Sequence, residues 1–127
     1  MAEKFHNVLL AEDDYANAEF VKLVLRNSNF SIIHALNGAQ AVEEFRSNPD
    51  IDLILMDIKM PVMDGYTATK EIRKINKNIP VIAVTAFALD GDREKALDAG
   101  CTDYVTKPVS KEKLTGMISF YLSKNLT

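Results

Sequence analysis

The chain has 127 residues, of which 47% are hydrophobic and 26% charged, and its formal net charge is −3. We expect a single domain over residues 1–127, and the acidic balance argues against nucleic acid or an anionic membrane as a direct partner. No apolar run approaches the ~20 residues of a membrane span, nothing near the N-terminus resembles a signal peptide, and the single Cys101 fits a reducing compartment, so we expect a soluble, cytoplasmic protein without membrane insertion.

Five strand-like segments alternate along the chain with segments of helical periodicity. The predicted strands are Asn7–Ala11, Ser31–Ala35, Leu53–Asp57, Val81–Thr85 and Asp103–Thr106. The third and fourth have continuous apolar runs, as expected for central strands of a parallel sheet that are covered on both faces. No repeat, linker or low-complexity segment divides the chain.

Each predicted strand is followed by a helical pattern. The apolar positions, helix by helix, are Phe20, Val21, Val24 and Leu25; Val42 and Phe45; Ala68, Ile72 and Ile75; Ala96 and Leu97; and Leu114, Met117, Ile118, Tyr121 and Leu122. The fifth set is the clearest, because it follows i, i+3, i+4, i+7, i+8 spacing. Asp13 or Asp14 is suited to cap the first helix, and Gly100 to end the fourth. Asn37-Gly38 has the composition of a hairpin turn, but helix-forming residues follow it, so we reject a hairpin there.

Five β–α alternations predict an α/β fold, a doubly wound parallel sheet with helices on both faces. Ligands of such sheets bind beyond the carboxyl ends of the strands. The unusual polar residues lie at those ends: Glu12, Asp13 and Asp14 after the first strand, Asp57 at the end of the third, and Lys107 after the fifth. Clustered carboxylates with one cation predict a divalent-metal site that serves a phosphoryl group.

These residues resemble the motifs of the response regulator receiver domain, the phosphoacceptor module of two-component signalling. The matching segments are residues 10–14 (Leu-Ala-Glu-Asp-Asp), 55–65 (Leu-Met-Asp-Ile-Lys-Met-Pro-Val-Met-Asp-Gly), 85–86 (Thr-Ala) and 107–108 (Lys-Pro). Each is a weak signal alone, but all four in this order, each at a strand end, are specific. The resemblance covers about residues 7–122 and implies a flavodoxin-like (βα)5 fold with five strands in the order 2-1-3-4-5.

The resemblance implies that Asp57 is the phosphoacceptor, since a carboxylate oxygen can attack a phosphoryl group and form an acyl phosphate. It implies Mg²⁺ as the cofactor, with Mn²⁺ or Ca²⁺ able to substitute. Asp13, Asp57 and the backbone carbonyl of Lys59 would ligate the metal directly, because Mg²⁺ prefers oxygen ligands. Glu12 would act through metal-bound water, and Asp14 is left to helix capping.

Lys107 resembles the lysine that pairs with a phosphoryl oxygen, and the resemblance implies a cis peptide bond between Lys107 and Pro108 that aims this side chain into the site. Thr85 resembles the switch hydroxyl that donates to the acyl phosphate and draws the following loop inward. Tyr104 resembles the aromatic residue that moves with that loop. Each has an ordinary alternative, as a solvent-exposed lysine, a β-branched strand residue and a strand tyrosine.

Two further positions modulate the approach of water to the phosphoryl group in the family. They lie two residues after the phosphoacceptor and two after the switch threonine, and hold Lys59 and Phe87 here. We hypothesise that Phe87 shields the acyl phosphate, so that Phe87→Ala would change the rate of autodephosphorylation. His6 and His34 do not resemble phosphodonors.

The expected function is phosphoacceptance from a histidine kinase or a histidine phosphotransfer protein, by a domain that catalyses its own phosphorylation and slower hydrolysis without being a conventional enzyme. Phosphorylation would alter the surface of the fourth helix, fifth strand and fifth helix. We expect a monomer when the chain is unphosphorylated. Residues 56–69 are most similar to receivers fused to sensor histidine kinases, so we expect the receiver part of a hybrid kinase, with a free-standing response regulator as the alternative.

Three other functions fit the residues less well. A flavin-binding protein of this fold needs Gly, Ser or Thr after the first strand, where Glu12, Asp13 and Asp14 would repel phosphate. A phosphatase with an aspartate nucleophile needs a second aspartate where Lys59 stands. A pseudo-receiver that never takes phosphate usually lacks one of the key residues, and all of them are present here.

Overall fold

The computed structural model describes residues 6–26, 29–86 and 91–124. Its strands are β1 (His6–Ala11), β2 (Phe30–Ala35), β3 (Ile51–Asp57), β4 (Val81–Thr85) and β5 (Asp103–Thr106). Its helices are α1 (Tyr15–Leu25), α2 (Gly38–Ser47), α3 (Gly65–Ile75), α4 (Asp92–Ala99) and α5 (Lys111–Lys124). The predicted modulating residue Phe87 lies outside the described residues. Within them, no helix combines the length and the apolar character needed to cross a membrane.

All five strands are parallel, in the order β2-β1-β3-β4-β5, which confirms the predicted sheet. The chain passes outward from β1 to β2 and then returns to place β3 on the other side of β1. The carboxyl ends of β1 and β3 are therefore neighbours at the point where the strand order reverses. Ala11 pairs with Met56 in this register, which brings the next residues, Glu12 and Asp57, to the same edge of the sheet.

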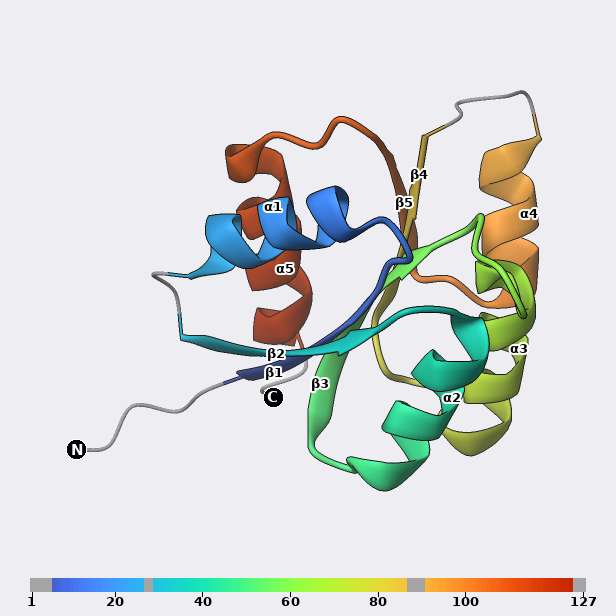
Figure 1. The fold of residues 1–127 in the computed structure, drawn as a ribbon. Helices are drawn as coiled ribbons and strands as arrows, with labels where there is room; N and C mark the ends of the chain where they lie inside the picture. The colour runs from blue at the N-terminus through green and yellow to red at the C-terminus, as the bar shows by residue number, and fades with distance from the viewer. Residues whose placement is uncertain (1–5, 27–28, 87–90, 125–127) are drawn as a thin grey trace.

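The sheet separates two helical layers, with α1 and α5 on one face and α2, α3 and α4 on the other (Figure 1). Each layer has its own core, and the strands contribute to both because successive side chains point to opposite faces. Thus Ile54 and Met56 pack with α2 and α3, whereas Leu53 and Leu55 pack with α1 and α5. Every residue of β3 except Asp52 is buried, in agreement with its continuous apolar run.

The predicted faces of the helices are confirmed for α2 and α5, where the largest buried side chains include Phe45, Leu114 and Ile118. Three other predicted core residues are about half exposed, however: Phe20 at 48%, Ile75 at 47% and Leu97 at 44%. Those three placements are wrong. The buried positions of α3 and α4 are held mostly by small residues, whereas α1 buries Val24 and Leu25 beside Ala18. The small buried residues of α3 and α4 are Gly65, Ala68, Thr69, Ala96 and Ala99.

Side-chain caps fix the starts of three helices beside the carboxyl edge of the sheet. Asp14, Asn37 and Asp64 each accept a hydrogen bond from the backbone N–H three residues on, at 3.2, 2.8 and 2.8 Å. Such a cap stabilises a helix by about 1 kcal/mol. Asp14 is therefore the cap of α1, and the hairpin at Asn37 is correctly rejected. Gly100 ends α4 at a φ of 108°, as predicted.

Candidate functional site

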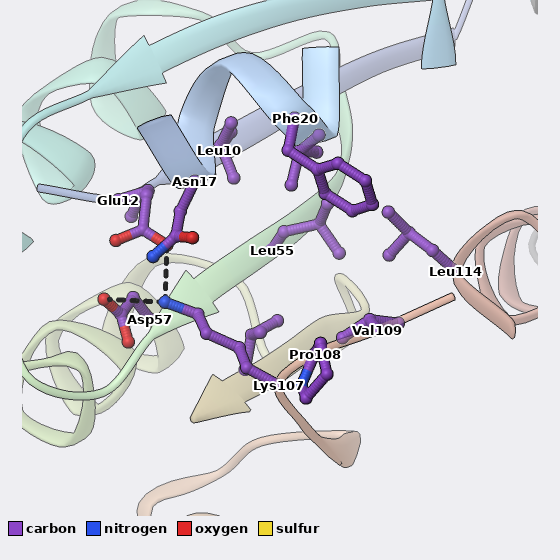
Figure 2. Close-up of a pocket in the computed structure, with 13 residues that line it drawn as sticks. Leu10, Glu12, Asn17, Phe20, Leu55, Asp57, Lys107, Pro108, Val109 and Leu114 are labelled. Atoms are coloured by element: carbon purple, nitrogen blue, oxygen red, sulfur yellow. Dashed lines mark hydrogen bonds and ion pairs between the residues drawn. The ribbon is translucent and has the colours of Figure 1, made fainter. Parts of the chain in front are cut away.

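Three charged side chains from three strand ends meet at the carboxyl edge of the sheet. Glu12 follows β1, Asp57 ends β3, and Lys107 follows β5; both carboxylates are buried, with 3% and 7% of their residue surfaces exposed. Lys107 Nζ lies 2.7 Å from Glu12 Oε1 and 3.6 Å from Asp57 Oδ2 (Figure 2). The ammonium thus lies between two carboxylates and is bonded more closely to Glu12.

This arrangement shifts the pKa values of Asp57 and Lys107. Burial raises the pKa of Asp57 to about 7, and the Glu12 carboxylate adds to the rise, while Lys107 and the Ile58 backbone amide act against it. Burial by itself would lower the pKa of Lys107, but its hydrogen bond to Glu12 and the charge of Asp57 outweigh burial and raise it. Lys107 therefore stays charged, and one cation is shared by two acids.

The exposed Asp13 completes an acidic cluster. Glu12, Asp13 and Asp57 each offer a carboxylate oxygen, and these oxygens lie within 4.8 Å of one another. Three clustered oxygen ligands, two of them on buried residues, fit Mg²⁺, which takes oxygen ligands and offsets the repulsion between carboxylates.

A hollow of about 190 Å³ joins most of the predicted site residues. It is lined by Glu12, Asp13, Asp14, Asn17, Asp57, Lys59, Thr85, Ala86 and Lys107. Tyr104 does not line this hollow; it is partly buried in β5 and packs against the core of the α2–α4 layer. The structure thus brings the predicted nucleophile, acidic residues, lysine and switch threonine together, whereas Tyr104 lies outside this group.

The backbone after β5 is tied to the end of β4. The N–H of Lys107 donates to the carbonyl of Thr85 at 2.7 Å, and the peptide bond between Lys107 and Pro108 is cis. The buried Thr85 and the ammonium of Lys107 therefore reach the site from adjacent strands whose ends are joined by a hydrogen bond.

A larger cavity of about 500 Å³ lies beside the charged trio, on the α1 and α5 face of the sheet. Its lining residues are Leu10, Ala11, Glu12, Asn17, Phe20, Val21, Leu55, Asp57, Val84, Lys107, Pro108, Val109 and Leu114. Figure 2 shows Phe20 pointing toward Leu114 across this space. The half-exposed Phe20 thus lines a cavity and is not packed in the core. Because most of the lining is apolar, this side of Asp57 offers little hydrogen bonding to a charged carboxylate.

The loop between β3 and α3 has contacts that the sequence does not reveal. Met63 N–H donates to the carbonyl of Pro61 at 2.7 Å, and Val62 between them has a φ of 70°. This is a γ-turn with its central residue in a region that strains a β-branched side chain. The loop is held at both ends, because Gly38 N–H donates to the Met63 carbonyl at 3.0 Å and Gly65 N–H to the Ile58 carbonyl at 2.8 Å.

We expect Val62→Gly to raise the free energy of unfolding by about 1 kcal/mol, because removal of the strain outweighs the greater entropy of glycine in the unfolded chain. Urea unfolding at constant slope measures the change. Val62→Ala is the matched control, since alanine keeps a Cβ at the same positive φ and should gain little. Equal stability of the glycine and alanine variants would show that the turn is not strained.

Comparison with known proteins identifies the family of the chain. A family model described as the response regulator receiver domain matches residues 8–119. Hybrid signal transduction histidine kinase I of Dictyostelium discoideum is 42% identical over 125 residues, which cover 92% of this chain and 7% of that protein. The polar-differentiation response regulator DivK of Brucella anthropi is 36% identical over 118 residues, covering 91% of this chain and 95% of that protein.

Solved structures of receiver domains have the same fold. The receiver domain of a Pseudomonas aeruginosa sensor histidine kinase, with a magnesium ion coordinated in its active site cleft, matches with a TM-score of 0.87 and 37% identity, over 94% of this chain and 99% of that one. The receiver domain of a Saccharomyces cerevisiae response regulator, in a complex with a histidine phosphotransfer protein, matches with a TM-score of 0.89 and 32% identity, over 97% and 92%. The chain belongs to the response regulator receiver domain family of two-component signalling.

Proposed function

We propose that Asp57 accepts a phosphoryl group from a phosphohistidine in a two-component phosphorelay. The observation that carries this proposal is the placement of Asp57: a buried carboxylate 3.6 Å from a lysine ammonium, in a cluster with the carboxylates of Glu12 and Asp13. The donor would be a histidine kinase or a histidine phosphotransfer protein, which the complex of the yeast relative supports.

In the proposed reaction, an oxygen of Asp57 forms a bond to phosphorus while the bond from phosphorus to the donor's imidazole nitrogen breaks. The electron pair of the broken bond stays on that nitrogen, which regains a proton from solvent. Lys107 neutralises charge on the phosphoryl oxygens. To do so, its ammonium must bind a phosphoryl oxygen in competition with the Glu12 carboxylate.

The metal site would be formed by Asp13, Asp57 and the carbonyl of Lys59, with Glu12 acting through water. Mg²⁺, when bound, supplies positive charge against the carboxylates and the phosphoryl group. Mn²⁺ and Ca²⁺ share its preference for oxygen ligands and are proposed as substitutes. Hydrolysis of the acyl phosphate would end the signal, in a slower reaction that the domain itself catalyses. The effect of Phe87 on the rate of that hydrolysis stays a prediction.

The signal would pass from the acyl phosphate to the surface of α4, β5 and α5. Thr85 would donate its hydroxyl to a phosphoryl oxygen, and Tyr104 would move with the loop that follows β4. One contact supports a route to α5: Asp103 accepts the backbone N–H of Tyr104 through Oδ1 at 2.7 Å and the hydroxyl of Tyr121 through Oδ2 at 2.6 Å. A displacement of Tyr104 would therefore be transmitted to α5 through the Asp103 carboxylate.

The wider setting is also proposed. We infer one receiver domain over residues 1–127, in the cytoplasm and monomeric before phosphorylation. The chain spans 7% of the Dictyostelium relative, which supports the receiver part of a hybrid histidine kinase, whereas the 95% coverage of DivK supports the alternative of a free-standing response regulator.

Intact mass after incubation with a small-molecule phosphodonor tests the proposal. We expect one Mg²⁺-dependent phosphoryl addition to the parent chain and none to Asp57→Asn. Asp98→Asn, which removes an exposed carboxylate from α4, is the control and should be phosphorylated like the parent. If folded parent protein that binds Mg²⁺ takes no phosphoryl group, either from this donor or from a phosphorylated histidine phosphotransfer protein, the chain is a pseudo-receiver that acts by contact alone.

A further inference from the structure

His34 is a histidine of the edge strand β2 that reaches the functional site. It pairs in register with Leu10 of β1, so both side chains lie on the sheet face that α1 and α5 cover. Its Nε2 atom is 2.8 Å from the backbone oxygen of Glu12. A carbonyl oxygen only accepts hydrogen bonds, so Nε2 carries the proton and donates it.

Two hydrogen bonds with β2 hold both backbone polar groups of Glu12. The N–H of Glu12 donates to the carbonyl of Ala35 at 3.0 Å, and its C=O accepts from His34. That carbonyl belongs to the peptide group that joins Glu12 to Asp13, and a peptide group is planar. Its orientation therefore decides how the side chains of Glu12 and Asp13 leave the backbone.

We propose that His34 is a positioning residue for the acidic cluster: its Nε2–H orients the peptide group between Glu12 and Asp13 and so places both carboxylates for a divalent cation. The inference rests on the proposed metal site and deepens it. His34 acts through Glu12 and contacts neither the phosphoryl group nor the metal. A hydrogen bond that served stability alone would leave the affinity of the folded protein for Mg²⁺ unchanged.

The dissociation constant for Mg²⁺, measured at pH 8 from amide NMR shifts, separates the two roles. His34→Phe keeps a ring but removes the donor, and we expect it to weaken Mg²⁺ binding about 3- to 10-fold, the range that one lost hydrogen bond supports. His34→Gln presents an amide N–H in a similar place and should restore binding to within about twofold of the parent. His6→Phe is the matched control, because His6 begins β1 at the opposite end of the sheet, and it should bind Mg²⁺ like the parent.

Unchanged Mg²⁺ affinity in folded His34→Phe would overturn the proposal, as would a glutamine variant as weak as the phenylalanine variant. If His34→Phe does not fold, His34→Asn, whose shorter side chain cannot reach the carbonyl, takes its place. The result is distinguishable from failure of the proposed function. A parent that binds Mg²⁺ but takes no phosphoryl group contradicts phosphoacceptance and leaves the role of His34 standing, whereas a parent that binds no Mg²⁺ overturns that role.

Discussion

Asp57→Asn is expected to raise the free energy of unfolding of the metal-free protein by on the order of 3 kcal/mol at pH 8. The cause is the pKa of Asp57, which burial and the Glu12 carboxylate raise from 3.8 to about 7 in the folded state. Above pH 7 the folded protein therefore holds a buried, ionised carboxylate next to a second one. Asparagine has nearly the same shape without the charge, so it removes this destabilisation.

The direction of the pH dependence follows from proton binding. Between pH 4 and 7 the folded state keeps the proton of Asp57 while the unfolded state has lost it, since the two pKa values are about 7 and 3.8. The unfolded state binds fewer protons, so stability falls as pH rises through this window and levels off above it. Asp57→Asn should lack this fall.

Urea unfolding at pH 5 and pH 8, with chelator present, measures both effects. The stabilisation by Asp57→Asn should be much smaller at pH 5 than at pH 8. Asp98→Asn serves as the control, because Asp98 is exposed on α4. Its replacement should give the same pH profile as the parent. Parallel pH profiles for the parent and Asp57→Asn would contradict a raised pKa at Asp57.

Gly65→Ala is expected to lower the free energy of unfolding by about 3 kcal/mol, at the upper end of the usual range for overpacking. A Cβ atom at Gly65 would lie 2.2 Å from the backbone oxygen of Asp57 and 2.9 Å from Cα of Ile58. Both are backbone atoms of the buried β3 end, so neither can turn away as a flexible side chain could. Accommodation would require α3 to shift from the strand that carries the phosphoacceptor.

Gly116→Ala provides the matched control for this substitution. A Cβ atom there would meet nothing within 4 Å, and Gly116 lies inside α5. Alanine is the better helix former, so this variant should be more stable than the parent by about 0.5–1 kcal/mol. Chemical unfolding of the two variants should therefore give changes of opposite sign. Parent-like stability of Gly65→Ala would mean that the β3–α3 junction relaxes freely.

Local sequence patterns predicted much of the fold. Continuous apolar runs identified the buried strands, and the spacing of Leu114, Ile118 and Leu122 identified the buried face of α5. These signals are local, because a strand or helix repeats its exposure over two to four residues. The same logic failed at Phe20, because hydrophobicity alone does not distinguish a side chain that packs in the core from one that lines a cavity.

The polar residues that end the strands are evident from the sequence alone, and the family motifs assign them roles. How these residues pair depends on the fold, because Glu12 and Lys107 are 95 positions apart and meet through the order of the strands. Burial, which sets the pKa of Asp57, likewise exists only in the folded chain. The bond from His34 to Glu12 is of the same kind: no local pattern distinguishes this histidine until β2 is placed beside β1.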